Sequence, residues 1–159
     1  MTAAPNDGRA GTKTIASNRR AFHDYAILDT LEAGIVLSGT EVKSLRANGC
    51  SLVDGFVRIR DGEAWLVNVH IPAYQQGTFF SQHESRRDRK LLLHGRELNR
   101  YVGTLQEKGL TLLPLRVYFR RNRVKVELGL ARGKKLYDKR QAIKAREARR
   151  EIERNVRRR

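Results

Sequence analysis

Apolar residues fall along the chain in short runs broken by Gly, Asn and Asp, a pattern typical of strands joined by tight turns. We expect six strands, over residues 25–28, 34–37, 56–60, 64–67, 110–119 and 124–130. The clearest hairpin has Asp61-Gly62 at its turn, because this dipeptide adopts the positive φ that a tight turn requires. Pro114 would interrupt a central strand, so we place it at a sheet edge or a bulge.

A different spacing appears in residues 95–108, where four apolar side chains recur at intervals of three and four residues. This spacing predicts a helix, which Gly109 terminates. A shorter helix is expected over residues 39–46, with Thr40 as its cap. We expect Trp65, which stands in an apolar run, to belong to the core, with stacking on a base as the minor alternative.

Short antiparallel strands with a few short helices predict a mainly β fold. We expect an OB-like antiparallel Greek-key barrel, because a barrel removes exposed strand edges and such barrels often bind RNA. Residues 1–12 are polar or small and predict a disordered N-terminus. Residues 13–131 would form the barrel domain, and residues 132–159 a basic C-terminal tail.

Charge is unevenly distributed and greatest in the tail. The chain has 33 Lys and Arg against 17 Asp and Glu, a net charge of +16, and its pI is about 10.9. Residues 132–159 hold 13 of the basic and four of the acidic residues. These values indicate a polyanionic partner, and phosphate is the commonest polyanion. The tail has few apolar residues, so we expect it to be disordered alone and helical on a polyanion.

The residue pattern does not support an enzyme. The four histidines are far apart and none has the spacing of a zinc-ligand pair, so we expect neither a metal nor a cofactor. No G-x-S-x-G motif occurs, and residues 129–135 have the wrong spacing for a phosphate loop. The single cysteine, Cys50, fits a reducing cytoplasm. No apolar run reaches the roughly 18 residues of a membrane span, and the polar start is no signal peptide.

Basic residues also cluster along the body of the chain, at positions 18–20, 85–90, 116 and 120–125. Any one such cluster is more often a solvated surface than a binding site. Together with the basic tail, the clusters favour nucleic acid as the partner. The octamer typical of an RRM domain is absent and aromatic residues make up only 7% of the chain, so base stacking is not expected to be the main mode of recognition.

Five strings stand out for their length and order. They are Ile15-Ala16-x-Asn18-Arg19-Arg20-Ala21-x-His23-Asp24-Tyr25, Glu32-Ala33-Gly34-Ile35, Gly39-Thr40-Glu41-Val42-Lys43-Ser44-Leu45-Arg46, Arg89-Lys90-Leu91-Leu92-Leu93-His94 and Gly129-Leu130-Ala131-Arg132-Gly133-Lys134-Lys135-x-Tyr137-Asp138-Lys139-Arg140. In this order, and with compatible spacing, they closely resemble the SmpB family of SsrA-binding proteins.

The resemblance implies a barrel that binds the tRNA-like domain of transfer-messenger RNA (tmRNA, or SsrA RNA). The pair would enter the vacant A site of a stalled bacterial ribosome and rescue it by trans-translation, so that the nascent peptide is tagged. The implied partners are tmRNA, small-subunit rRNA at the decoding centre and, indirectly through tmRNA, elongation factor Tu and alanyl-tRNA synthetase. In the family the tail lies as a helix in the mRNA channel, so intact mRNA excludes it.

The implied site residues fall into two groups. Four residues match family positions implicated in RNA binding: Asn18, Glu32, Leu92 and Lys125. Six more are expected to contact tmRNA because of their charge or planar ring: Arg19, Arg20, His23, Lys43, Arg46 and Lys90. The segment expected at the decoding centre and in the mRNA channel comprises Gly133, Lys134, Lys135, Tyr137, Asp138, Lys139 and Arg140.

Two other functions stay open at this point. A structural RNA-binding component of the ribosome would also suit a basic OB-like core, and it would be present on every ribosome. An RNA-processing enzyme would need a cluster of catalytic residues, which the sequence pattern does not reveal.

Overall fold

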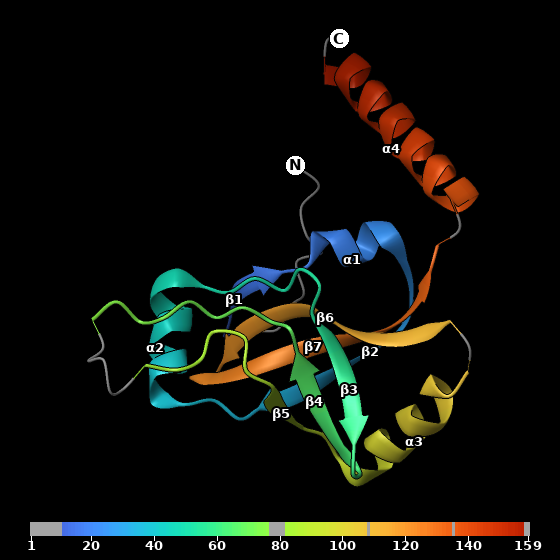
Figure 1. The fold of residues 1–159 in the computed structure, drawn as a ribbon. Coiled ribbons are helices and arrows are strands. Elements are labelled where there is room, and N and C mark those ends of the chain that lie inside the picture. The colour runs from blue at the N-terminus through green and yellow to red at the C-terminus, as the bar shows by residue number, and fades with distance from the viewer. Residues whose placement is uncertain (1–10, 77–81, 108, 135, 158–159) are drawn as a thin grey trace.

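The computed structural model describes residues 11–76, 82–107, 109–134 and 136–157. In these residues seven strands form one antiparallel sheet in the order β1-β6-β7-β2-β5-β4-β3 (Figure 1). The strands are β1 (Thr12–Ser17), β2 (Tyr25–Ile35), β3 (Phe56–Arg60), β4 (Glu63–Val67), β5 (Arg89–Leu92), β6 (Leu110–Arg120) and β7 (Arg123–Gly133). The helices are α1 (Arg19–Asp24), α2 (Gly39–Asn48), α3 (Gly95–Leu105) and α4 (Leu136–Arg157). The expected mainly β fold with short helices is confirmed.

Both expected hairpins are confirmed. β3 and β4 are joined by Asp61 and Gly62, whose φ angles are 51° and 73°. The turn between β6 and β7 places Arg121 and Asn122 at positive φ. Pro114 lies at a bulge, where the register between β6 and β7 shifts. β1 pairs with β6 only from Arg116 to Arg120, so Pro114 lies just beyond the end of β1 and pairs with Leu128 of β7.

The first two expected strands are in fact one. β2 runs unbroken from Tyr25 to Ile35, because Ala33 and Gly34 pair with β7 and do not form a turn. Gly34 fits this position closely: a Cβ there would lie 3.2 Å from the Cβ of Leu92 on β5. β1, α1 and β5 are further elements that the hydrophobic pattern did not predict.

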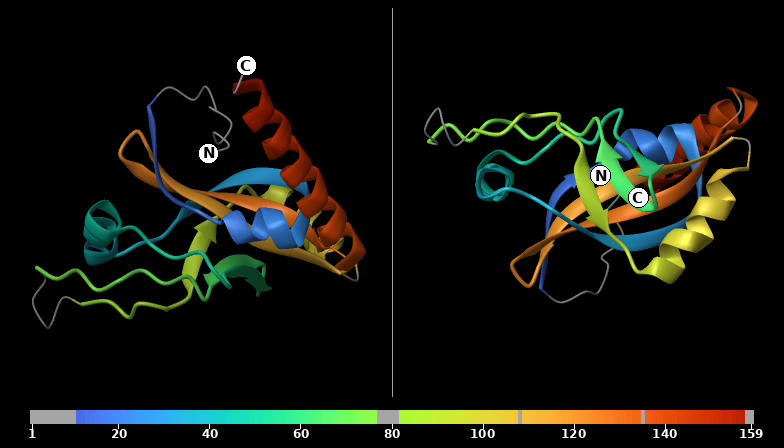
Figure 2. Two further views of the ribbon diagram at one scale, coloured as in Figure 1. Left: turned by 90° about the horizontal axis from the view of Figure 1, so that it is seen from above. Right: turned by 60° about the horizontal axis from the view of Figure 1, so that its bottom comes forward.

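The sheet curls on itself, so that β3 contacts β6 although the two strands are not neighbours in the sheet (Figure 2). The OB-like barrel that results encloses the main apolar core, to which β4, β6 and β7 contribute Leu66, Leu112 and Val126. α2 and α3 lie at opposite ends of the sheet (Figure 1) and add Leu45 and Tyr101 to this core.

A smaller apolar cluster lies on the outer face of the sheet, beneath α1. Ala21 of α1 packs there with Leu113, Leu115 and Ala131. Gly129 makes room for the cluster, since a Cβ at this position would lie 2.7 Å from Leu115 Cδ1. α1 therefore covers only one end of the outer face.

Two local expectations were wrong. The cap of α2 is Ser38 and not Thr40: the Ser38 hydroxyl accepts from the Glu41 N–H, and the Glu41 carboxylate accepts from the Ser38 N–H. Trp65 is not a core residue, because it belongs to neither apolar cluster of the described chain and alternates along β4 with the buried Ala64 and Leu66. The ring therefore lies on the outer face.

The tail forms α4, which projects from the end of β7 (Figure 1). Its apolar residues Ile143, Ile152 and Val156 are exposed, the last two by 64% and 70%. The expectation of a disordered tail without a partner is not met. Alanines, long side chains and the i,i+4 pair of Arg149 with Glu153 (3.8 Å) favour the helix. No helix of the described chain is long and apolar enough to cross a membrane.

Candidate nucleic-acid interface

One row of paired residues crosses four strands on the outer face of the sheet. Leu92 of β5 pairs with Gly34 of β2, Gly34 with Lys125 of β7, and Lys125 with Tyr118 of β6. Leu92 lies against the backbone of Gly34 and is 53% exposed. Only a glycine therefore separates two of the residues expected to bind RNA, an exposed leucine and a lysine.

Glu32 lies two residues before Gly34 on β2 and so on the same face. Its carboxylate accepts hydrogen bonds from the Tyr118 hydroxyl and from the Arg120 guanidinium, the latter at 2.9 Å. Burial raises the pKa of Glu32, but the bonds from Tyr118 and Arg120 and the charge of Lys125 outweigh it and hold the pKa below 4.5. We call Glu32, Tyr118, Arg120 and Lys125 the outer ion cluster.

Asn18, at the junction of β1 and α1, is buried with 7% of its surface exposed. Its side-chain oxygen accepts from the Ala21 N–H at 3.1 Å and so caps α1. The amide nitrogen donates to the carbonyls of Pro114 (3.1 Å) and Leu52 (3.4 Å), and the backbone N–H donates to Leu115 O at 2.7 Å. Asn18 thus fixes α1 to the bulge of β6.

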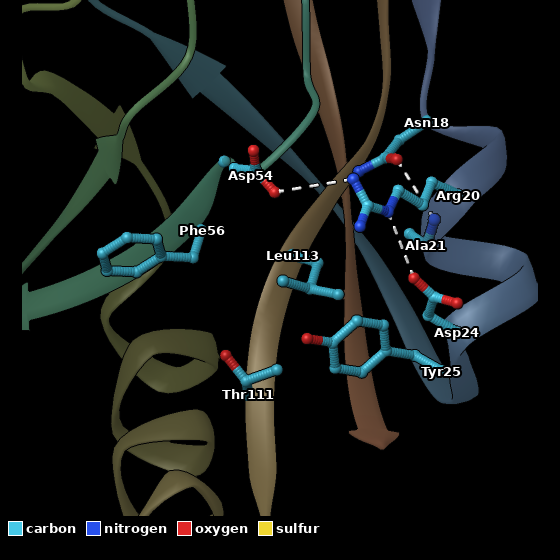
Figure 3. A pocket seen from close by; sticks show the side chains of 10 residues that line it. Asn18, Arg20, Ala21, Asp24, Tyr25, Asp54, Phe56, Thr111 and Leu113 are labelled. Carbon is cyan, nitrogen blue, oxygen red and sulfur yellow. Dashed lines mark hydrogen bonds and ion pairs between the residues drawn. The ribbon is translucent and has the colours of Figure 1, made fainter. Parts of the chain in front are cut away.

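The other candidates on α1 face solvent. Arg19 is exposed, and Arg20 reaches Asp24 at 3.3 Å and Asp54 at 4.0 Å. His23 Nδ1 lies 2.8 Å from Asp24 Oδ1. Figure 3 shows Arg20 between the two aspartates, beside a hollow of about 360 Å³. The rest of this hollow is lined by Asn18, Ala21, Tyr25, Gly55, Phe56, Thr111 and Leu113.

Lys43 and Arg46 are exposed on α2, at one end of the barrel. The Arg46 guanidinium lies 5.1 Å from the centroid of the Phe119 ring, and Lys43 Nζ lies 6.0 Å from that of Tyr74. These two cations are therefore presented from a helix end of the barrel and not from the outer ion cluster.

A buried ion cluster holds α2 in place. Glu41 and Arg89 have fully buried side chains, 2.8 Å apart, and Arg87 donates to both oxygens of Glu41 at 2.9 and 2.7 Å. Burial raises the pKa of Glu41, but hydrogen bonds from Arg87, the Ser38 N–H and Arg89 outweigh it and keep the pKa below 4.5. We call Glu41, Arg87 and Arg89 the inner ion cluster.

The basic run at 85–90 is therefore only partly exposed, and the expectation that it forms one basic surface does not hold throughout. For Arg89 that interpretation is wrong, because its guanidinium donates to the carbonyls of Val69 (2.8 Å) and Ser85 (3.1 Å) inside the protein. Lys90 is half-exposed on β5 and forms an ion pair with Glu63 at 2.6 Å. Lys90 therefore extends the surface of Leu92 toward β4.

The tail begins where the sheet ends. Gly133, the last residue of β7, pairs with Tyr25 of β2. The Lys134 N–H donates to Asp24 O at 3.0 Å, and its ammonium donates to Phe22 O at 3.3 Å. Lys135 lies outside the described residues. The other expected tail residues belong to α4: Tyr137, Asp138, Lys139 and Arg140.

Tyr118 is a member of the outer ion cluster that the sequence analysis missed. Tyr118 is itself buried, with 6% of its surface exposed, and the bulge between Pro114 and Arg116 shifts the alternation along β6, so its role emerges only when β6 is aligned with β7 and β2. Within the described residues, no group of three or more His, Cys, Asp or Glu side chains is placed to hold a metal ion.

Comparison with known proteins identifies the family. The SmpB protein family model matches residues 15–158. The SsrA-binding protein of Acidothermus cellulolyticus is 63% identical over 150 residues, covering 94% of each chain, and that of Thermobifida fusca is 60% identical over 153 residues, covering 96% of this chain and 95% of the relative.

A solved structure gives the same answer. A chain from "tmRNA-SmpB: a journey to the center of the bacterial ribosome" is 54% identical, with a TM-score of 0.65, and the match covers 76% of this chain and 85% of that one. With the family model matching nearly the full sequence, this chain belongs to the SmpB family.

Proposed function

We propose that this protein binds the tRNA-like domain of tmRNA and delivers it to the vacant A site of stalled bacterial ribosomes for trans-translation. The observation that carries the proposal is the patch of the exposed Leu92 with the partly exposed Glu32 and Lys125, on the face that α1 partly covers. Relatives about 60% identical are SsrA-binding proteins, and the similar solved chain belongs to a tmRNA–SmpB study of the ribosome.

The patch offers RNA three kinds of contact. Lys125 and Arg120 supply charges for phosphates. Glu32, ionised and held by Tyr118 and Arg120, keeps that guanidinium oriented or accepts from a base amino group. Leu92 supplies an apolar surface for a ribose or base. Asn18 acts by positioning α1, whose Arg19, Arg20 and His23 add contacts at the covered end of the face.

The tail has a separate role in this proposal. α4 has 22 residues and is therefore about 33 Å long. Its exposed basic side chains suit an rRNA-lined channel, so that Gly133 to Arg140 reach the decoding centre and the rest of α4 occupies the empty mRNA channel. The protein acts by binding in the cytoplasm and performs no chemical step. Elongation factor Tu and alanyl-tRNA synthetase join the complex through tmRNA.

A gel-shift and tagging comparison tests this division. Full-length protein and a variant ending at Leu136 are titrated with the tRNA-like domain of tmRNA and with ordinary tRNA. The truncation leaves the sheet intact, because β7 ends at Gly133. We expect both proteins to prefer tmRNA, and only the full chain to support peptide tagging on stalled ribosomes. Equal affinity for the two RNAs, or presence on every ribosome in equimolar amount, would contradict the proposal.

A further inference from the structure

Four planar side chains stand in an alternating array on the outer face of the β3–β4 hairpin. Phe56, Arg58 and Arg60 alternate along β3, and Trp65 on β4 pairs directly with Arg58. The Arg58 guanidinium lies 5.4 Å from the centroid of the Phe56 ring, and that of Arg60 lies 5.0 Å from the Trp65 ring. We call these four residues the hairpin array.

The core does not require this arrangement. The inward positions of the hairpin are filled by Val57, Ala64 and Leu66, all buried. Trp65 and Arg58 lie on the opposite face, and Arg58 is exposed. Tryptophan has the largest apolar side chain, and the protein leaves its only copy outside the barrel. A partly exposed indole flanked by guanidinium groups is suited to a flat, electron-rich ligand.

The surroundings of the array indicate the class of ligand. Lys90 of β5 pairs with Trp65 of β4, and Arg60 forms an ion pair with Asp88 at 3.0 Å. Lys90 is itself bound to Glu63, so much of the local positive charge is already balanced. Affinity here would therefore come from stacking more than from phosphate neutralisation. Nucleobases stack on aromatic rings and on guanidinium planes whatever their sequence, but only when they are unpaired.

We propose that the hairpin array is a second RNA contact, which stacks unpaired bases. The inference rests on the proposed function and enlarges it. Leu92 and Lys90 on β5 connect the array to the patch around Lys125, and Phe56 connects it to the hollow beside α1 (Figure 3). RNA held on the outer ion cluster thus continues onto the hairpin only where it offers single-stranded bases.

The single tryptophan provides a direct readout. Full-length protein is titrated with a short oligoadenylate and with an RNA duplex of similar length, and Trp65 emission is recorded alongside the anisotropy of the labelled RNA. We expect oligoadenylate to quench the emission as it binds, whereas duplex binding leaves it unchanged. Failure of oligoadenylate to bind, or saturating binding with unchanged emission, overturns the proposal.

Substitutions at Trp65 and at the two arginines of the array test whether stacking, and not charge or a folding defect, determines the affinity. Trp65→Leu is expected to lower oligoadenylate affinity about tenfold, while Trp65→Phe keeps most of it. Equal affinity of the two variants would contradict stacking. If Trp65→Leu does not fold by circular dichroism, Arg58→Gln with Arg60→Gln takes its place, with Trp65 quenching as the signal. Arg96→Gln, an exposed arginine on α3, is the matched control and should bind normally. Failure of the proposed function shows separately, as loss of the preference for tmRNA over tRNA.

Discussion

The inner and outer ion clusters use the same chemistry for opposite purposes. Each places one glutamate against an arginine and a second cation. In the inner cluster the Glu41 and Arg89 side chains are fully buried, and backbone carbonyls such as Val69 O take the remaining guanidinium hydrogens. In the outer cluster Glu32 is 25% and Arg120 45% exposed. Arg120 can therefore turn toward an arriving phosphate, whereas Arg89 cannot.

The comparison shows that burial, not residue type, decides whether an arginine serves the fold or a ligand. Buried charges are costly to leave unpaired, so loss of one partner of a buried ion pair destabilises a protein by about 3–5 kcal/mol. An exposed pair contributes only about 0–1 kcal/mol, because water screens it and the side chains lose entropy. Variants in the two clusters should therefore fail in different assays.

The largest expected effect is that of Arg89→Met. It leaves the buried Glu41 carboxylate with Arg87 and the Ser38 N–H as partners, and we expect a loss of about 3–5 kcal/mol in the free energy of unfolding, measured with urea. Arg86→Gln is the control from the same basic run; Arg86 is exposed and donates to Asn68 at 2.7 Å. It should change stability by less than about 1 kcal/mol. Similar losses of unfolding free energy in both variants would show that burial does not distinguish Arg89 from Arg86.

Lys125→Ala tests the outer cluster. We expect affinity for the tRNA-like domain to fall by up to about tenfold, and the slope of log affinity against log salt to flatten by about 0.7–0.9, the value of one phosphate contact. The unfolding free energy should hardly change, because Lys125 contributes no core side chain. An unaltered salt slope would show that Lys125 makes no phosphate contact.

Both ion clusters should contribute to the dependence of stability on acid pH. The pKa values of Glu41 and Glu32 lie below the usual 4.5, so each carboxylate binds protons less readily in the folded than in the unfolded chain. The stabilisation of the folded state by each ionised carboxylate is complete above pH 4.5, the usual pKa. It is lost as the pH falls through the lowered pKa of the folded protein. The free energy of unfolding, measured with urea from neutral pH to below pH 4, should decline less steeply with falling pH in Glu41→Gln than in the parent protein. The same change should be smaller in Glu32→Gln. A decline as steep as in the parent protein would exclude Glu41 as a source.

The smallest effect is expected for Glu63→Gln. The Glu63–Lys90 pair spans 2.6 Å, but its side chains are 43% and 38% exposed, so its loss should cost less than about 1 kcal/mol of stability. The variant frees Lys90 for RNA, and affinity should rise slightly at low salt. A stability loss as large as that of Arg89→Met would show that exposure is a poor guide here.

Residue patterns within a short stretch of sequence predicted the turns and hairpins, which depend on that stretch alone. Asp61-Gly62 specifies its hairpin because the turn itself needs positive φ. The hydrophobic pattern indicates a break at Gly34, since nothing local reveals that Leu92 packs against its backbone. The polar strand β1 shows no apolar alternation and is held by pairing with β6.

The candidate site divides in the same way. The resemblance to a family selected Glu32, Leu92 and Lys125, which the strand register then brought together. The basic run at 85–90 looked uniform, because charge alone does not tell a buried arginine from an exposed one. The hydrophobicity of Trp65 predicts a core position, whereas its place in the alternation along β4 puts it on the outer face.

The attachment of the tail has a mechanical consequence. Lys134 is tied to α1 through Asp24 O and Phe22 O, just before α4 starts. A rotation of about 10° at this root swings the far end of a roughly 33 Å helix through about 6 Å. The contacts of Lys134 with α1 therefore hold the point at which the chain leaves the sheet, and a small angular change there is magnified along the length of α4.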